Sequence, residues 1–99
     1  MTGSSRSSDG LDARRRRVLF RAWRRGTREM DLLLGRFADA HIGDLSERDL
    51  ADFEALMDVP DGDLFSWVTG REPAGSNFAT PLYFAILAFH STDTSHEQD

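Results

Sequence analysis

The charged stretch around the glycine at position 26 is the part of the sequence whose residue types could do chemistry. Its charged and glycine positions are Arg24, Arg25, Gly26, Arg28, Glu29 and Asp31. Guanidinium and carboxylate groups form strong charge-assisted hydrogen bonds across protein surfaces, and a glycine lets a partner's backbone come close. A protein-contact site is one interpretation of this stretch. A helix cap at Gly26 beside surface charges is simpler, and the residues alone favour it.

No other cluster in the sequence has the spacing of a catalytic or metal site. The chain contains no cysteine, which excludes disulfides, thiol catalysis and cysteine-ligated zinc. The three histidines, at unrelated spacings, predict no metal site, and the aspartates at 58–63 lack the register of a calcium loop. The sequence also has no glycine-rich phosphate loop and no nucleophile elbow. We therefore expect no enzymatic activity, no metal and no stably bound cofactor.

The charge of the chain is distributed unevenly. Residues 1–36 contain ten arginines and four acids, whereas residues 37–99 contain two arginines and thirteen acids. Arg14 to Arg17 cover more than one helical turn, so part of this run must face solvent or a partner. The run suits a solvated helix face, an acidic protein surface, or nucleic acid with Phe20 and Trp23 nearby. The pI of 5.1 argues against nucleic acid.

Apolar residues recur at helical spacing along the chain and predict an all-α fold, a small bundle of five short helices. The expected ranges are 11–24, 28–40, a helix that follows Ser46, 63–69 and 80–90. Thr27 and Ser46 are expected N-caps, and Gly26 and Gly70 are expected to end the helices before them. The Gly26 link predicts that the first two helices form an antiparallel pair.

Residues 82–89 are apolar on nearly all sides, which a buried strand could also explain. The Thr80-Pro81 start and the two alanines favour a helix, either central in the core or partly exposed as a docking surface. The Ser/Gly-rich residues 1–10 and the polar residues 91–99 are expected to be disordered tails. This leaves 11–90 as a single domain.

The sequence also bears on location. No apolar run approaches the roughly 20 residues that span a bilayer, so we expect no membrane insertion. The first residues lack the apolar core of a signal peptide, and Asp9 and Asp12 argue against a transit peptide. We expect the cytoplasm of a bacterium rather than a mitochondrial matrix.

Three motifs in order along the chain resemble one known family. They are Arg25-Gly26-x-x-Glu29 followed by Asp31, then Leu50-x-x-Phe53-Glu54-x-Leu56-Met57, then Asp61-x-Asp63-Leu64-Phe65-x-Trp67. The first motif is weak by itself, and its order and spacing relative to the third make the match specific. This pattern resembles the SdhE family, the succinate dehydrogenase assembly factor 2 or flavinylation factors. The resemblance covers about residues 11–72.

The resemblance implies a five-helix bundle that is not itself an enzyme. Family members bind the flavoprotein subunit of succinate dehydrogenase, and in bacteria also that of fumarate reductase. They promote covalent attachment of FAD to a histidine of that subunit. By position, Arg25, Gly26 and Glu29 would form the surface that contacts the flavoprotein, and the flanking residues would be Arg24, Arg28 and Asp31.

The resemblance thus predicts an assembly chaperone that acts on FAD attachment and supplies positioning rather than chemical groups. We expect the chain to be a monomer. The alternative, from a different class, is a small arginine-rich regulator that binds nucleic acid or acts like an antitoxin. It would use the arginines of residues 14–25.

Overall fold

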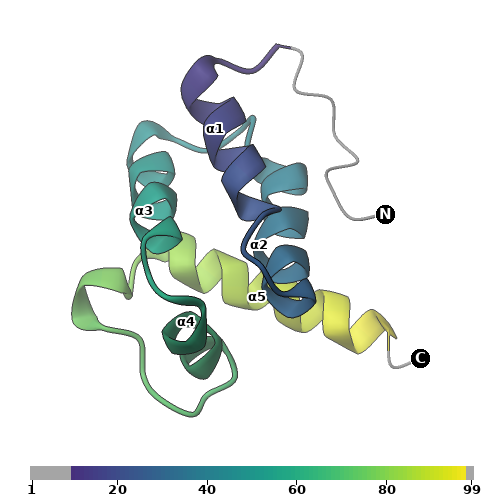
Figure 1. Ribbon diagram of the computed structural model, residues 1–99, viewed down its shortest axis with the longest axis vertical. Helices are drawn as coiled ribbons and strands as arrows, with labels where there is room; N and C mark the ends of the chain where they lie inside the picture. The colour runs from purple at the N-terminus through teal and green to yellow at the C-terminus, as the bar shows by residue number, and fades with distance from the viewer. Residues whose placement is uncertain (1–9, 98–99) are drawn as a thin grey trace.

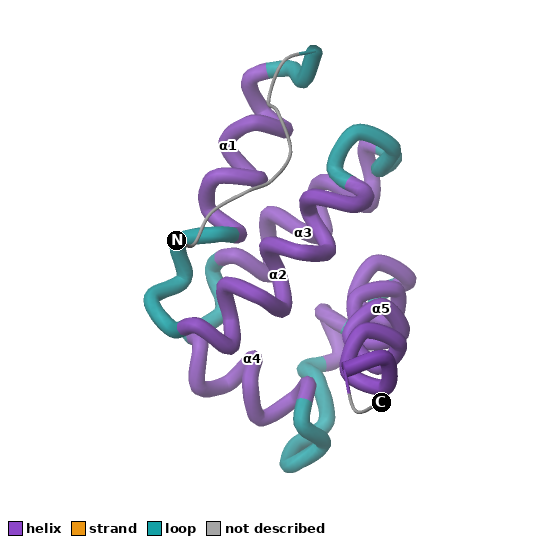
Figure 2. The backbone as a smooth tube through the Cα atoms, turned by 90° about the vertical axis from the view of Figure 1, so that its right-hand side faces the viewer, coloured by secondary structure: helices purple, strands orange, loops and turns teal. Residues whose placement is uncertain are grey.

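The computed structural model describes residues 10–97, which form five α-helices and, within that range, no strand. The elements are α1 (Ala13–Ala22), α2 (Arg28–His41), α3 (Glu47–Met57), α4 (Asp61–Val68), the short 3-10 helix η1 (Ser76–Phe78) and α5 (Pro81–Glu97). Helices α1, α2 and α3 run up and down beside one another, and α5 crosses them and packs on α2 and α3 (Figures 1 and 2). The predicted all-α fold of five helices is confirmed.

The core is built from the apolar stripes that the sequence predicts. The buried residues of the first three helices are Val18, Leu19, Ala22, Met30, Leu33, Leu34, Phe37, Ala38, Leu50, Phe53, Leu56 and Met57. Phe53 is fully buried and meets Phe37 edge to face, with ring centroids 5.7 Å apart. Burial of this apolar surface is the main stabilising contribution to the bundle.

Three helices begin at the residues expected to cap them. The hydroxyl of Thr27 accepts a hydrogen bond from the Met30 N–H (3.3 Å), and that of Ser46 accepts one from the Asp49 N–H (3.0 Å). The Thr80 hydroxyl accepts a hydrogen bond from the Tyr83 N–H at 3.1 Å. Each bond satisfies one of the backbone donors left unpaired at a helix start, so these predicted helix starts are confirmed.

The first helix is shorter than the predicted range 11–24. It begins after Asp12, whose carboxylate accepts a hydrogen bond from the Arg15 N–H, and it ends at Ala22. Gly26 therefore does not cap this helix but lies in the loop that follows it. The chain leaves the helical path at Trp23 because its side chain packs on α2, as described below.

Helix α4 begins at Asp61, two residues before the predicted range 63–69, so Asp61 and Gly62 are helical rather than part of a turn. The carboxylates of Asp61 and Asp63 lie in its first turn, where the helix dipole favours negative charge. Gly70, with φ +82°, ends the helix as predicted. The Arg71 N–H donates to the Ser66 carbonyl, which closes the last turn.

The last helix continues past its predicted end at His90 as far as Glu97, so residues 91–97 are helical and not a tail. No glycine or proline follows Pro81, so nothing in the backbone stops the helix. Residues 82–89 are helical rather than a strand; Leu82, Tyr83 and Ile86 are buried, whereas Phe84 is 54% exposed. The expected tail at 1–10 lies outside the described residues except for Gly10. Within the described part of the chain, no helix combines the length and the apolar character needed to cross a bilayer.

Candidate functional site

The loop between α1 and α2 carries the charged stretch that the sequence singles out. Gly26, Thr27, Arg28 and Glu29 are all exposed, and we call this edge the notch. Gly26 has φ +108°, a conformation that L side chains rarely adopt, and a Cβ built on it would meet no atom within 4 Å. Glycine is therefore needed here for backbone geometry, and the space above it is open to another molecule.

Arg25 points away from this edge and into the protein. Its side chain is only 10% exposed. Its Nη1 donates to the Met57 carbonyl at 2.5 Å, its Nη2 to the Val59 carbonyl at 2.6 Å, and its Nε to Oδ1 of Asp61 at 2.8 Å. The guanidinium thus ties the notch loop to the corner between α3 and α4, where it pairs carbonyls that the end of α3 leaves free.

Asp31 also turns inward. Its Oδ1 accepts a hydrogen bond from the backbone N–H of Arg25 at 2.7 Å, which braces the loop from the side of α2. The structure therefore brings the six predicted site residues together around one loop, but two of them point into the protein and four lie on its surface. Arg25 and Asp31 hold the loop in place, and the exposed ones are Arg24, Gly26, Arg28 and Glu29.

A hollow of about 300 Å³ lies beside the notch, between the first turns of α2 and α4. Its lining residues are Thr27, Glu29, Met30, Asp61, Gly62 and Phe65. Met30 is buried and Phe65 half-buried, whereas Glu29 is exposed, so the hollow has an apolar floor and an acidic rim. Of the residues that line this hollow, only Glu29 was predicted from the sequence to belong to the site. Asp61 and Phe65 belong to the third sequence motif, and that motif is the sequence feature that could have indicated their place in the site.

Trp23 fixes the other end of the notch loop. Its indole lies so close to Gly35 of α2 that a Cβ at this position would overlap the ring. The indole Nε1–H donates to Oδ1 of Asp39 at 3.1 Å, which fixes how the ring lies on the helix. A side chain at position 35 would therefore displace the ring and the loop attached to it.

We expect Gly35→Ala to lower the free energy of unfolding by about 1–3 kcal/mol, since overpacking forces the indole to move. Gly62→Ala is the matched control, because position 62 is helical and a Cβ there meets nothing within 4 Å. The control should leave stability unchanged or raise it slightly. Urea unfolding followed by circular dichroism measures both, and equal stabilities of the two variants would contradict the packing of Trp23 on Gly35.

The arginines of α1 and of the residues that follow it divide into two sets. Arg14 forms salt bridges with Glu47 (2.8 Å) and Glu54 (2.7 Å) of α3. The hydrogen bond between Arg14 and Glu54 lowers the pKa of the Glu54 carboxyl and raises the pKa of the Arg14 guanidinium. Nearby, Arg15 donates to the Ile42 carbonyl. Arg21 pairs with Asp58 at 3.0 Å. These three arginines are thus engaged by the chain itself.

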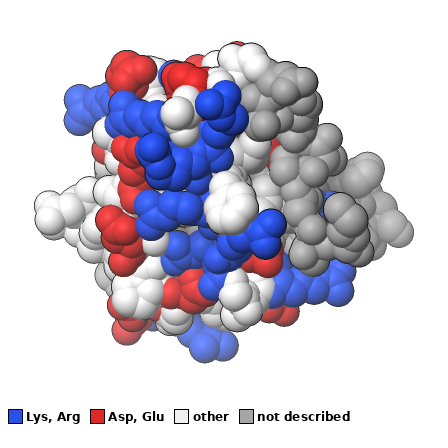
Figure 3. Space-filling view, turned by 45° about the horizontal axis from the view of Figure 1, so that its top comes forward, with Lys and Arg blue, Asp and Glu red and all other residues white. Residues whose placement is uncertain are grey.

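The second set faces away from the helix bundle. Arg16, Arg17, Arg24 and Arg28 are exposed and form no salt bridge with any residue that the structure describes. Figure 3 shows arginines gathered in a continuous band on the face that it presents, with acidic side chains along its borders. The predicted exposure of part of the 14–17 run is therefore confirmed.

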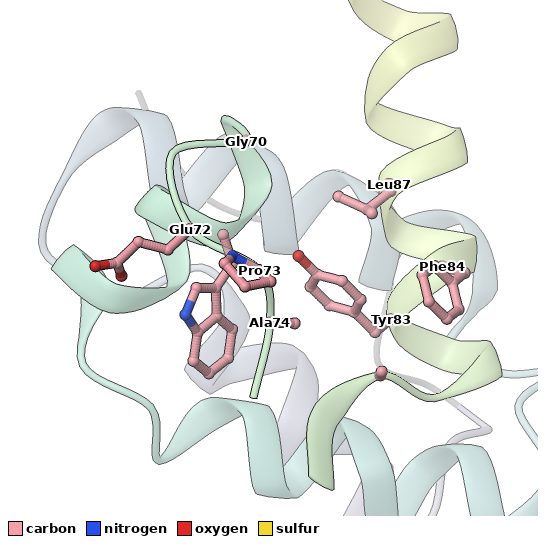
Figure 4. A pocket seen from close by; sticks show the side chains of 9 residues that line it. Gly70, Glu72, Pro73, Ala74, Tyr83, Phe84 and Leu87 are labelled. Carbon is pink, nitrogen blue, oxygen red and sulfur yellow. The ribbon is translucent and has the colours of Figure 1, made fainter. Parts of the chain in front are cut away.

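A second, larger hollow of about 570 Å³ lies between α4, the loop that follows it, and α5 (Figure 4). Its lining residues are Trp67, Gly70, Glu72, Pro73, Ala74, Ala79, Tyr83, Phe84 and Leu87. Burial raises the pKa of the Tyr83 hydroxyl. None of these residues belongs to the notch.

Comparison with known proteins bears on what the notch is for. A family model described as "Flavinator of succinate dehydrogenase" matches residues 16–90. The chain belongs to this family. Among flavinator relatives, the FAD assembly factor SdhE of Acetobacter pasteurianus is 41% identical over 81 residues, which are 82% of this chain and 74% of that protein. The family resemblance inferred from the three motifs is therefore confirmed.

More distant flavinator relatives are mitochondrial. The succinate dehydrogenase assembly factor 2 of Mycosarcoma maydis is 36% identical over 74 residues, 75% of this chain and 31% of that protein. Its counterpart in Dictyostelium discoideum is 36% identical over 72 residues, 73% of this chain and 51% of that protein. The chain thus spans about half or less of these mitochondrial proteins. No solved structure gives a significant match.

Proposed function

We propose that this chain is an assembly factor that binds the flavoprotein subunit of succinate dehydrogenase and promotes covalent attachment of FAD to it. Membership of the flavinator family supports the reaction. The observation that supports the notch as the docking site is its geometry. Gly26 offers bare backbone under open space, and the exposed Glu29 beside it forms no ion pair or hydrogen bond with the described residues.

The proposed mechanism is positioning. The notch holds the immature flavoprotein in a conformation competent for self-catalysed flavin attachment, which lowers the entropic part of the barrier. Gly26 and Glu29 make the contact, Arg24 and Arg28 flank it, and Arg25 acts through the loop that it fixes. The chain supplies no catalytic group and holds no FAD stably.

The proposal extends to related partners and to location. We propose that the chain also serves the flavoprotein subunit of fumarate reductase, acts as a monomer and works in the bacterial cytoplasm. The similarity to a bacterial factor supports the location. The alternative function, nucleic-acid binding, is weakened because Arg14 and Arg21 already pair with carboxylates of this chain.

Covalent flavin on the flavoprotein subunit, read as in-gel fluorescence, tests the proposed function. Cells of the native host would carry the chain, lack it, or lack it and receive it again from a plasmid. The fluorescence of the subunit should fall in the cells without the chain and return on complementation, at equal amounts of the subunit protein. Undiminished fluorescence without the chain would rule out the function.

Glu29→Gln separates contact from folding, since this side chain is exposed and unpaired among the described residues. We expect its stability to stay within about 0.5 kcal/mol of the wild type, as for surface positions generally. Its affinity for the purified flavoprotein subunit should fall about tenfold, since a carboxylate that pairs across an interface is lost. The matched control is Glu72→Gln, another exposed glutamate far along the chain. Equal affinities of the two variants in calorimetric titrations would remove Glu29 from the contact.

A further inference from the structure

Phe20 is the one aromatic side chain of α1 and it lies on the surface. It is 58% exposed, whereas the other apolar residues near it in the helix, Val18, Leu19 and Ala22, are buried. Exposed aromatic rings flanked by arginine are typical of the centres of protein interfaces, where these residue types are enriched. Phe20 is therefore a candidate contact residue that neither the motifs nor the notch include.

Arginines surround this ring. The guanidinium of Arg24 lies over it at 4.4 Å from the ring centroid, a cation–π contact that holds both side chains in place. Arg16 and Arg17 precede Phe20 by four and three residues, so on a helix they lie on the same side of α1. We call Arg16, Arg17, Phe20 and Arg24 the basic aromatic face. Its arginines form no salt bridge with a described residue, although Arg16 donates to the Leu11 carbonyl and the charge of Arg17 helps to lower the pKa of the Glu54 carboxyl.

The charge of this face defines the chemistry of its partner. Three exposed guanidiniums that form no salt bridge within the described part of the chain suit a surface lined by carboxylates, and the ring beside them suits an apolar recess. Arg24 is followed directly by Arg25 and Gly26, so the face continues into the notch. A partner seated on the notch would meet both surfaces.

A protein partner fits this face better than a nucleic acid. Arg24 already covers one side of the Phe20 ring, on which a base would otherwise stack. The chain as a whole carries a net charge of −5, whereas domains that bind nucleic acid are usually basic. A protein partner can instead receive the exposed ring in an apolar recess without stacking on it.

We propose that the basic aromatic face is a second contact with the flavoprotein subunit and seats Phe20 in an apolar recess ringed by acidic side chains. This inference rests on the proposed function. In this proposal the notch determines the orientation of the bound flavoprotein. The basic aromatic face increases the affinity and steers the encounter electrostatically.

The test is the affinity of the full chain for the purified, flavin-free subunit at low and high salt. Phe20→Ala combined with Arg17→Gln, which leaves every residue at the notch unchanged, should weaken binding by about tenfold or more at low salt, as for the loss of an aromatic and arginine hot spot. It should also flatten the salt dependence, because one steering charge is gone. Phe84→Ala combined with Arg71→Gln removes a similarly exposed phenylalanine and an arginine that forms no salt bridge with the described residues, and should change affinity by less than about twofold.

The outcomes separate the two claims. If Gly26→Arg abolishes binding while the Phe20/Arg17 and Phe84/Arg71 variants bind equally well, the basic aromatic face is not a contact and the proposed function stands. If the wild-type chain does not bind the subunit at all, the proposed function fails and the inference fails with it. If the Phe20/Arg17 variant keeps its affinity for the subunit and loses affinity only for a DNA or RNA oligonucleotide titrated in parallel, the face binds nucleic acid and the inference is overturned.

Discussion

Gly26→Arg is expected to abolish binding of the flavoprotein subunit and the covalent flavin that depends on it. The position has φ +108° and open space above it, so the new side chain would project from the notch into the volume that the partner occupies. Its conformation also costs about 1–2 kcal/mol in a residue with a Cβ. The chain should therefore fold with a lowered melting temperature and still fail to dock.

Gly70→Arg is the matched control for this prediction. Gly70 also has a positive φ, +82°, and a Cβ there also meets no atom within 4 Å, but it lies after α4 and outside the notch. The two variants should lose similar stability in thermal unfolding, whereas the Gly70 variant alone should bind the subunit and restore flavin fluorescence. Loss of both activities in both variants would mean that the effect at position 26 comes from backbone strain and not from blocked contact.

Arg25→Ala is expected to lower the free energy of unfolding by about 2–4 kcal/mol, because it leaves two carbonyls and a half-buried carboxylate without their partner. Arg25→Lys should recover only part of this loss, since an ammonium on a flexible stem cannot reproduce the planar fork that reaches Met57, Val59 and Asp61 together. Arg14→Lys is the control, and it should cost much less because the Arg14 side chain is 38% exposed, against 10% for Arg25.

The two possible roles of Arg25 give different results in binding. If it only positions the loop, the lysine variant should bind the flavoprotein nearly as well as wild type at a temperature where it is fully folded. The alanine variant should then fail in proportion to its unfolded fraction. Loss of binding in a lysine variant that is fully folded at the temperature of the measurement would instead place the Arg25 side chain in the contact.

The direction of the site residues could not be predicted from the sequence, although their grouping could. The stretch 24–31 is contiguous, so any fold keeps its members close. Whether Arg25 points outward or inward depends on acceptors at Met57, Val59 and Asp61, which are 32 to 36 residues away along the chain. A local pattern contains no information on these long-range partners.

The sequence predicted the positions of the helices more accurately than it predicted their ends. The apolar stripes of α2 and α3 repeat at helical spacing and are buried as predicted, because the same stripe that defines the helix also fills the core. The predicted end of α1 is wrong because Trp23 leaves the helix to pack on Gly35, which is a tertiary contact. The predicted end of α5 is wrong because polar residues alone, without a glycine or proline, do not stop a helix.

The most direct test of the notch as the docking surface is site-specific photo-crosslinking. A benzophenone amino acid would replace Arg28, an exposed notch residue, or Asn77, an exposed residue of η1 outside both proposed contacts. After irradiation with the purified flavin-free subunit, we predict a covalent adduct of the two proteins from position 28 and none from position 77. An adduct from position 77 with none from position 28 would contradict docking through the notch.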